Sequence, residues 1–160
     1  MVRDWTLSRR DCEVVNKYRK QYRLGFAIQL CAMRLYGRFL NQLHDLSPRV
    51  ISYLSSQLDL PPTLTVEVPE REATVLEHRN NILKYLGFHR FDDKVEADLD
   101  RWIEEHAQQG LLPDELFHRA ERHLLLKRIV LPGPTTIERQ IIRICNQVHA
   151  QLFEQVFDQM

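Results

Sequence analysis

The chain has 160 residues, of which 44% are hydrophobic and 28% are charged, and its 22 Lys and Arg residues balance its 22 Asp and Glu residues. This composition is typical of one globular domain or two very small ones and excludes most unusual composition classes. The 3 cysteines are widely spaced, so neither a disulfide framework nor a Cys-x-x-Cys zinc site is expected, and a reducing cytoplasm fits best. No apolar run reaches the roughly 18–20 residues of a membrane span and no signal peptide is evident, so no membrane contact is expected.

The first part of the chain is expected to be helical. Glycines and prolines are sparse and no segment shows sustained alternation of apolar and polar residues, which favours an all-α fold, a compact multi-helix domain. Ser8 followed by Asp11 resembles a capping box and predicts a helix over 8–21. Apolar residues spaced by three and four predict a second helix over 24–35, which Gly37 ends.

Two further helices are expected before residue 90. Ser47 followed by proline is an N-cap signal and predicts a short helix through about residue 57. Pro69 opens the next helix, predicted over 70–86, and Gly87 stands where a left-handed C-cap is needed. The apolar side of that helix is expected to consist of Leu76, Ile82, Leu83 and Leu86.

The rest of the chain predicts three helices and one extended connection. Gly110 ends the first of these helices, and Thr135 or Thr136 caps the last. The expected order is an acidic helix over 92–109, a helix over 114–127, an extended or turned segment over 129–134, and a final helix towards the C-terminus. We therefore expect two helical units, 1–90 and 91–160, packed as one compact body.

The zero net charge conceals basic and acidic blocks. Residues 1–40 hold nine basic and three acidic residues, residues 92–121 hold three and ten, and residues 122–143 hold five and one. Lys and Arg side chains bind duplex phosphates by releasing counterions, so the first block is a candidate phosphate-contacting surface, although a solvated polar face explains the charges equally well. The residues assigned to phosphate contacts are Arg9, Arg10, Lys17, Lys20 and Arg23.

The second basic block has the outline of a helix-turn-helix unit. The block consists of a helix, a turn rich in proline and glycine, and a further helix. Side chains able to reach phosphates or base edges cluster at the start of this second helix. The residues assigned to this candidate recognition helix are Thr135, Thr136, Arg139, Gln140 and Arg143. Surface charges paired with Glu138 are the competing interpretation, and a weaker outline of the same kind spans 47–86.

No enzymatic motif is present. The glycines never group into a phosphate-binding loop, and neither Gly-x-Ser-x-Gly nor His-Glu-x-x-His occurs. Glu115 and His118 match one Glu-x-x-His element of di-iron bundles, but the second element that such a site requires is missing. We expect no catalytic residue, no metal ligand and no cofactor.

Several motifs together resemble the N-terminal region of the TnpA transposases of the Tn-three family. The order and spacing of the motifs also match, and the resemblance covers nearly the whole chain. The motifs are Arg3-Asp-Trp-Thr-Leu-Ser8, Arg23-Leu-Gly-Phe-Ala-Ile-Gln-Leu-Cys31, Gly37-Arg-Phe39, His78-Arg-Asn-Asn-Ile82, Tyr85-Leu-Gly-Phe88, Arg128-Ile-Val-Leu-Pro-Gly133 and Ile137-Glu-Arg139.

This resemblance implies a helical DNA-binding part of a larger transposase, one that recognises the terminal inverted repeats during DNA transposition. The catalytic acidic residues of the family lie far downstream in another domain, so this chain by itself is expected not to be an enzyme. Expected partners are the double-stranded DNA of transposon ends, the downstream catalytic part and a second copy of the chain, in the nucleoid of a bacterial cytoplasm. The alternative is a helical protein-interaction or oligomerisation module, belonging to a transposase or to a free-standing regulator.

Overall fold

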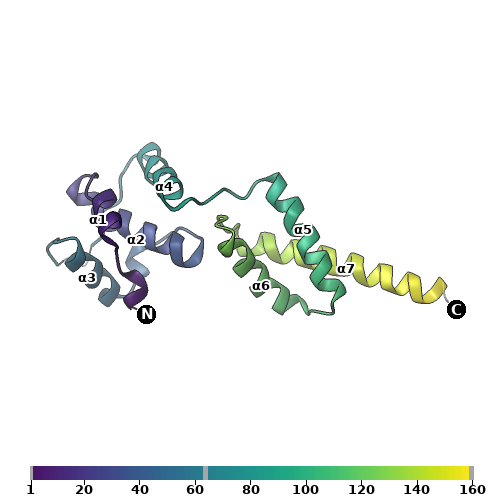
Figure 1. The fold of residues 1–160 in the computed structure, drawn as a ribbon. Helices are drawn as coiled ribbons and strands as arrows, with labels where there is room; N and C mark the ends of the chain where they lie inside the picture. Colours follow the sequence, from purple (N-terminus) through teal and green to yellow (C-terminus); the bar gives the residue numbers. More distant parts are fainter. Residues whose placement is uncertain (1, 63–64, 159–160) are drawn as a thin grey trace. The chain divides into compact units, whose positions relative to one another are not determined.

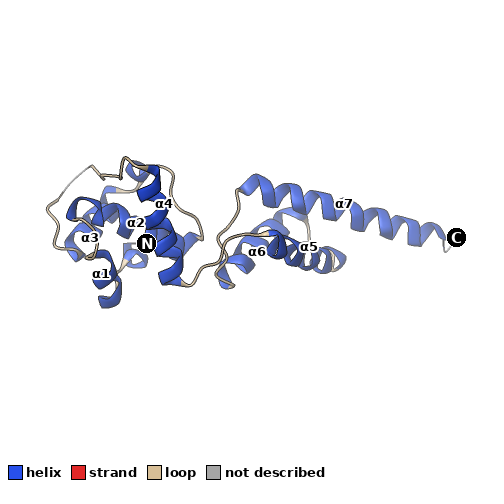
Figure 2. Ribbon diagram, turned by 90° about the horizontal axis from the view of Figure 1, so that it is seen from above, coloured by secondary structure: helices blue, strands red, loops and turns tan. Residues whose placement is uncertain are grey.

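The computed structural model describes residues 2–62 and 65–158, and all regular elements in these ranges are helices, as the sequence predicts (Figures 1 and 2). The chain divides into two compact units, Met1–Phe88 and His89–Met160. Within the described ranges, no helix combines the length and the apolar character that crossing a membrane requires.

Over residues 2–62 and 65–88, the first unit contains six helical elements, in the order 3-10 helix η1 (Val2–Trp5), α1 (Arg9–Val15), α2 (Lys20–Tyr36), 3-10 helix η2 (Leu43–Asp45), α3 (Pro48–Gln57) and α4 (Glu72–Leu86). The second helix, α2, is central, because it contacts α1, α3 and α4. Its side chains Ile28, Leu30 and Met33 are fully buried in the core of this unit. Burial of α2 is wider than the predicted apolar stripe, because every residue from Leu24 to Met33 except the half-buried Gln29 is buried, and the helix therefore organises the unit.

The first helix begins as predicted but ends early. The Ser8 side chain accepts a hydrogen bond from the backbone of Asp11, and the Asp11 carboxylate accepts one from the backbone of Ser8, so the capping box is confirmed. The helix ends at Val15 and the chain turns before α2 begins at Lys20, so the prediction of one helix over 8–21 is wrong. The Arg23 guanidinium binds carbonyl groups of this turn, a contact that local helix propensity cannot anticipate.

The other helix ends in the first unit follow the sequence signals closely. Ser47 caps α3, and Gly37 and Gly87 end α2 and α4 in the left-handed conformation, with φ of 68° and 72°. The helix predicted over 70–86 begins at Glu72, and Leu76 on it is 53% exposed, so its assignment to the apolar side is wrong. Helical spacing alone does not show how wide a buried stripe is.

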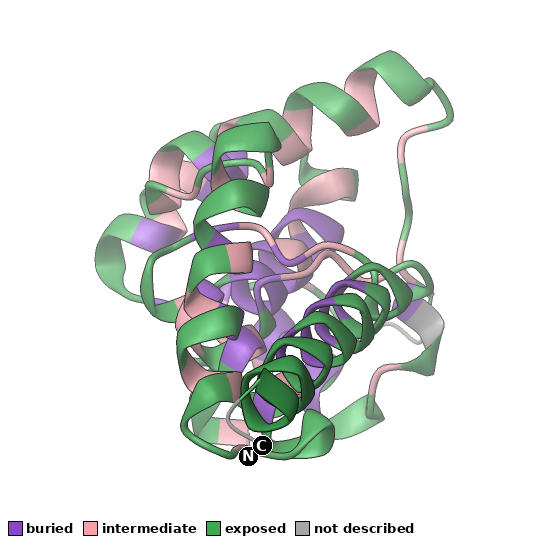
Figure 3. Ribbon diagram, turned by 90° about the vertical axis from the view of Figure 1, so that its right-hand side faces the viewer, coloured by how far each residue is buried: buried purple, intermediate pink, exposed green. Residues whose placement is uncertain are grey.

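The second unit is a three-helix arrangement of α5 (Asp93–Gln108), α6 (Pro113–Leu126) and α7 (Pro134–Asp158). Its core is formed by apolar side chains of all three helices, among them Leu99, Ile103, Leu116, Leu124, Ile137 and Ile141. The segment between α6 and α7 is extended, as predicted, and forms a parallel bridge between His89 and Ile129. Residues 149–158 of α7 are exposed (Figure 3).

The start of the last helix differs from the prediction. Helix α7 begins at Pro134, so Thr135 and Thr136 lie in its first turn and neither is the cap. Proline is favoured at the first helical position because its fixed φ suits the helix and its missing N–H needs no partner there. The two threonine side chains are exposed.

Candidate nucleic-acid interface

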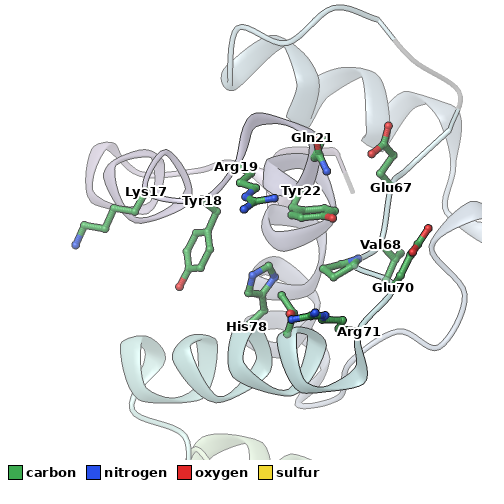
Figure 4. Close-up of a pocket in the computed structure, with 12 residues that line it drawn as sticks. Lys17, Tyr18, Arg19, Gln21, Tyr22, Glu67, Val68, Glu70, Arg71 and His78 are labelled. Carbon is green, nitrogen blue, oxygen red and sulfur yellow. The ribbon is translucent and has the colours of Figure 1, made fainter.

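A groove of about 830 Å³ lies in the first unit, between the α1–α2 turn and the N-terminal part of α4 (Figure 4). Lys17, Tyr18 and Arg19 come from the turn, and Tyr22 comes from the first turns of α2. The opposite side is formed by the segment that leads into α4 and by α4 itself. Its lining residues are Glu67, Val68, Pro69, Glu70, Arg71, Thr74 and His78.

The turn that carries the cations is fixed by hydrogen bonds to side chains of neighbouring helices. The Arg23 guanidinium donates to the carbonyl oxygens of Asn16 and Tyr18, both at 3.0 Å. The Tyr18 ring stacks on Phe26 with centroids 4.1 Å apart, and its hydroxyl accepts a 3.0 Å hydrogen bond from Asn81 of α4. Lys17 and Arg19 are therefore presented by an ordered turn and not by a loose loop.

The other wall depends on a glycine in α2. A Cβ atom built on Gly25 would lie 3.2 Å from the carbonyl oxygen of Glu67 and 3.4 Å from the Val66 side chain. A side chain at position 25 would thus require this segment to move away from α2 by a few tenths of an ångström. The absence of a side chain at Gly25 allows Glu67 to approach the helix and to border the groove.

The groove combines charges of both signs with aromatic rings. Lys17, Arg19 and Arg71 form no ion pair within the described part of the chain, and neither do Glu67 and Glu70. Burial lowers the pKa of His78 below its ordinary value, against the opposing charge of Glu77. His78 is therefore mostly uncharged at neutral pH, and the positive charge of the groove comes from its Lys and Arg side chains.

The structure places the five expected phosphate contacts of the first unit in different surroundings. Lys17 lines the groove, and Lys20 lines a neighbouring cavity of about 420 Å³. Arg9 is 96% exposed beside Glu13, and the Arg10 guanidinium lies 5.7 Å from the centre of the Tyr85 ring. Arg23 is engaged in the turn described above, so its role in phosphate binding stays a prediction.

Two cations of the groove were not among the expected contacts. Arg19 belongs to the basic run of the first 40 residues, and it lies in the turn because α1 ends at Val15. Arg71 stands alone in an acidic stretch and gives no sequence signal. The folding of α4 against α2 brings it to the same groove as Lys17.

The residues assigned to the candidate recognition helix also lie in different surroundings, some exposed and others bound to α5. Thr135, Thr136 and Arg139 are exposed on the first turns of α7, and Arg139 forms no ion pair within the described residues. Gln140 is only 4% exposed and donates to the Glu96 carbonyl at 3.1 Å and to the Asp100 carboxylate at 2.7 Å.

Arg143 is also bound to α5, because its guanidinium donates to Asp100 at 2.9 Å. The structure thus directs Gln140 and Arg143 towards α5 and leaves the two threonines and Arg139 facing solvent.

Across the described ranges, no group of three or more His, Cys, Asp or Glu side chains has an arrangement suited to a metal ion.

These features define an all-α domain with exposed cations beside a groove in one unit and at the start of a long helix in the other. The chain belongs to the family described as Domain of unknown function (DUF4158), which it matches over residues 1–144.

The resemblance to the N-terminal region of Tn-three family transposases is confirmed by three relatives. The chain is 30% identical over 153 residues to the transposase for transposon Tn1546 of Enterococcus faecium, covering 95% of this chain and 16% of that protein. It is 32% identical over 160 residues to the transposase for transposon gamma-delta of Escherichia coli (strain K12), covering 98% and 16%. It is 31% identical over 166 residues to the transposase for transposon Tn501 of Pseudomonas aeruginosa, covering 99% and 16%. The chain therefore spans about 16% of the length of these relatives.

Proposed function

We propose that this chain is the DNA-binding region of a transposase and that it recognises the terminal inverted repeats of a transposon. The similarity to transposases of several transposons supports the class of protein. The observation that carries DNA binding is the gathering of Lys17, Arg19 and Arg71 around one groove, with no ion pair to a described residue. Unpaired cations held by a rigid scaffold gain free energy when they replace the counterions of a duplex.

The proposed mechanism separates anchoring from sequence recognition. Lys17, Arg19 and Lys20 contact phosphates on the first unit, with Arg9 and Arg10 adding charge from the start of α1. Thr135, Thr136 and Arg139 reach base edges or phosphates from the N-terminal turns of α7, where the helix dipole also favours a phosphate. Strand cleavage and joining belong to the remainder of a transposase, which is the partner that this region positions on the transposon ends, in the nucleoid of a bacterial cytoplasm.

Fluorescence anisotropy tests this proposal directly. The chain is titrated with a duplex carrying the terminal repeat of its own transposon and with a scrambled duplex, each at several salt concentrations. We expect a preference of about a thousandfold or more for the repeat and a steep loss of affinity with salt. Equal binding to both duplexes would contradict repeat recognition, and no binding at low salt would contradict DNA binding altogether.

A matched pair of charge variants locates the phosphate contacts. Lys17→Gln is expected to weaken binding to both duplexes equally and to reduce the salt slope by about one unit. Lys94→Gln removes an exposed lysine from α5, within the acidic stretch, and is expected to leave the slope unchanged. Equal slopes for Lys17→Gln and the unmodified chain would place the groove away from DNA.

A second function is supported by the exposed apolar end of α7. Leu152, Phe153, Val156 and Phe157 are between 48% and 67% exposed, and large exposed apolar patches mark interaction sites. The alternative proposal is therefore an interaction module that docks on the rest of the transposase or on a second copy of the chain. Light scattering after size exclusion tests the second copy, and a monomer at all concentrations would contradict it.

A further inference from the structure

The groove of the first unit contains groups that phosphate anchoring leaves unused. Lys17 and Arg19 belong to the α1–α2 turn, whereas Glu67, Glu70 and Arg71 line the opposite wall, and the Tyr22 ring lies between Arg19 and Glu67 (Figure 4). We propose that this groove binds one unpaired nucleotide of DNA, with its phosphate at Lys17 and Arg19, its base against Tyr22 and its base edge towards Glu67. This inference rests on the proposed function, because bound DNA supplies the nucleotide.

The phosphate end is defined by exposed cations and by a helix start. Lys17 and Arg19 are both exposed and without an ion pair to a described residue. Helix α2 begins directly after Arg19, and no side chain caps it. The first N–H groups of α2 carry partial positive charge and add to the attraction for a phosphate held by the two side chains.

The aromatic part of the groove offers one ring for stacking. One face of Tyr18 is already covered by Phe26, and its hydroxyl is bonded to Asn81. Tyr22 differs, because within the described residues its only ring contact is an edge contact with His78 at 6.1 Å between centroids. A base can therefore stack on Tyr22 without displacing a ring of the protein, and such stacking accepts any base.

The carboxylate end gives a reason for base preference. Glu67 forms no ion pair within the described ranges and only accepts hydrogen bonds when it is ionised. Adenine, cytosine and guanine carry an exocyclic amino group that donates to a carboxylate, whereas the only donor on the pairing edge of thymine is its ring N3–H, which is flanked by two carbonyl oxygens that a carboxylate repels. Bases with an amino group are expected to bind more tightly than thymine.

Stacking on Tyr22 requires a nucleotide outside the helix, and the groove has room for one. Its volume of about 830 Å³ is within the range of about 300–1,000 Å³ typical of small-molecule sites. A base inside a duplex has both faces covered by neighbouring bases, so it cannot also stack on Tyr22. Only a nucleotide that leaves the stack can use the cations, the ring and the carboxylate together.

The test compares labelled duplexes of the terminal repeat that differ at one position by fluorescence anisotropy. One is fully paired, and the others carry a single bulged adenosine, a single bulged thymidine or a single bulged abasic nucleotide, which controls for bending. We expect the adenosine bulge to bind at least fivefold more tightly than the abasic bulge, with thymidine between them. Equal affinity for all three bulges would overturn the inference and leave the proposed function intact. Failure to bind the fully paired duplex would instead overturn the proposed function.

Variants of the groove separate its parts. Tyr22→Ala is expected to remove the advantage of the adenosine bulge over the abasic bulge, and Tyr22→Phe to keep it, because the ring and not the hydroxyl stacks. Glu67→Gln is expected to abolish the preference for adenosine over thymidine, whereas Glu77→Gln, which replaces an exposed carboxylate of α4 outside the groove lining, leaves it unchanged. An unchanged preference in Glu67→Gln would overturn the role of that carboxylate. If Tyr22→Ala fails to fold, the comparison of bulges in the unmodified chain still decides the proposal.

Competition with a free nucleotide shows whether the groove takes its nucleotide from bound DNA or from solution. Deoxyadenosine monophosphate is added at increasing concentration to the complex with the adenosine-bulged duplex. We expect no displacement at micromolar concentration, since the free nucleotide lacks the additional phosphate contacts of the duplex. Displacement at micromolar concentration would overturn the assignment to DNA and indicate a site for free nucleotides.

Discussion

The Tyr85 hydroxyl donates a 2.6 Å hydrogen bond to Oδ1 of Asp11, which lies 74 positions earlier in the chain. The same buried carboxylate accepts two hydrogen bonds from the Arg34 guanidinium, at 2.9 and 2.7 Å, and one from the backbone of Ser8. Asp11 therefore joins the start of α1 to α2 and α4, the helices that border the groove.

Replacement of Asp11 is expected to destabilise the first unit. Asp11→Asn keeps the shape but removes the charge that the partly exposed Arg34 needs, and we expect a loss of about 3 kcal/mol in the free energy of unfolding. Urea denaturation measures this loss. Glu13→Gln removes the exposed partner of Arg9 on the same helix, and its expected effect is below about 0.5 kcal/mol. Similar effects of the two substitutions would contradict the central role of Asp11.

The same carboxylate predicts how stability depends on pH. Burial alone would raise the pKa of Asp11, but hydrogen bonds from Arg34, Tyr85 and Ser8 and the charge of Arg34 lower it to about 2. Because the pKa is lower in the folded chain than in the unfolded chain, the contribution is complete above about pH 4 and is lost as the pH falls towards 2. We expect this contribution to be about 2 kcal/mol.

Unfolding experiments between pH 2 and pH 5 measure the contribution, with Asp11→Asn as the reference. The substituted chain lacks the ionisable group, so its stability is expected to vary less over this range. Parallel pH profiles for the two chains would show that Asp11 does not have a lowered pKa.

Arg23 is expected to act through the turn that carries Lys17 and Arg19. Arg23→Ala removes hydrogen bonds to the carbonyl groups of Asn16 and Tyr18, and we expect hydrogen exchange of residues 16–20 to become faster and stability to fall by about 1–2 kcal/mol. The salt slope of DNA binding is expected to stay within half a unit. A slope reduced by a full unit with unchanged exchange would instead support the phosphate contact predicted from the sequence.

Two neighbouring residues of α7 are expected to differ in their effects. Arg139→Ala removes an exposed side chain, and we expect it to cost roughly 1–3 kcal/mol of binding to the terminal repeat and less to a scrambled duplex, with stability unchanged. Gln140→Ala removes a buried side chain bonded to α5, and we expect a loss of about 1–3 kcal/mol of stability with repeat preference retained.

Thermal unfolding and anisotropy on the same preparations separate the two effects. The idea of a recognition surface on the exposed side of α7 would be refuted by a loss of repeat preference in Gln140→Ala together with full preference in Arg139→Ala.

The sequence by itself determined the helical class, the family resemblance and most helix ends. The capping box of Ser8 and Asp11 and the glycine ends at Gly37 and Gly87 agree with prediction because each depends on residues within a few positions of one another. Only the tertiary structure decided which polar and charged side chains are free and which are bound to other helices. Gln140 and Arg143 meet Asp100 from 40 and 43 positions away, and Arg71 reaches the groove of Lys17 through the packing of α4 on α2. Such contacts depend on how helices pack over long separations in sequence, which the spacing of residues within one helix does not specify.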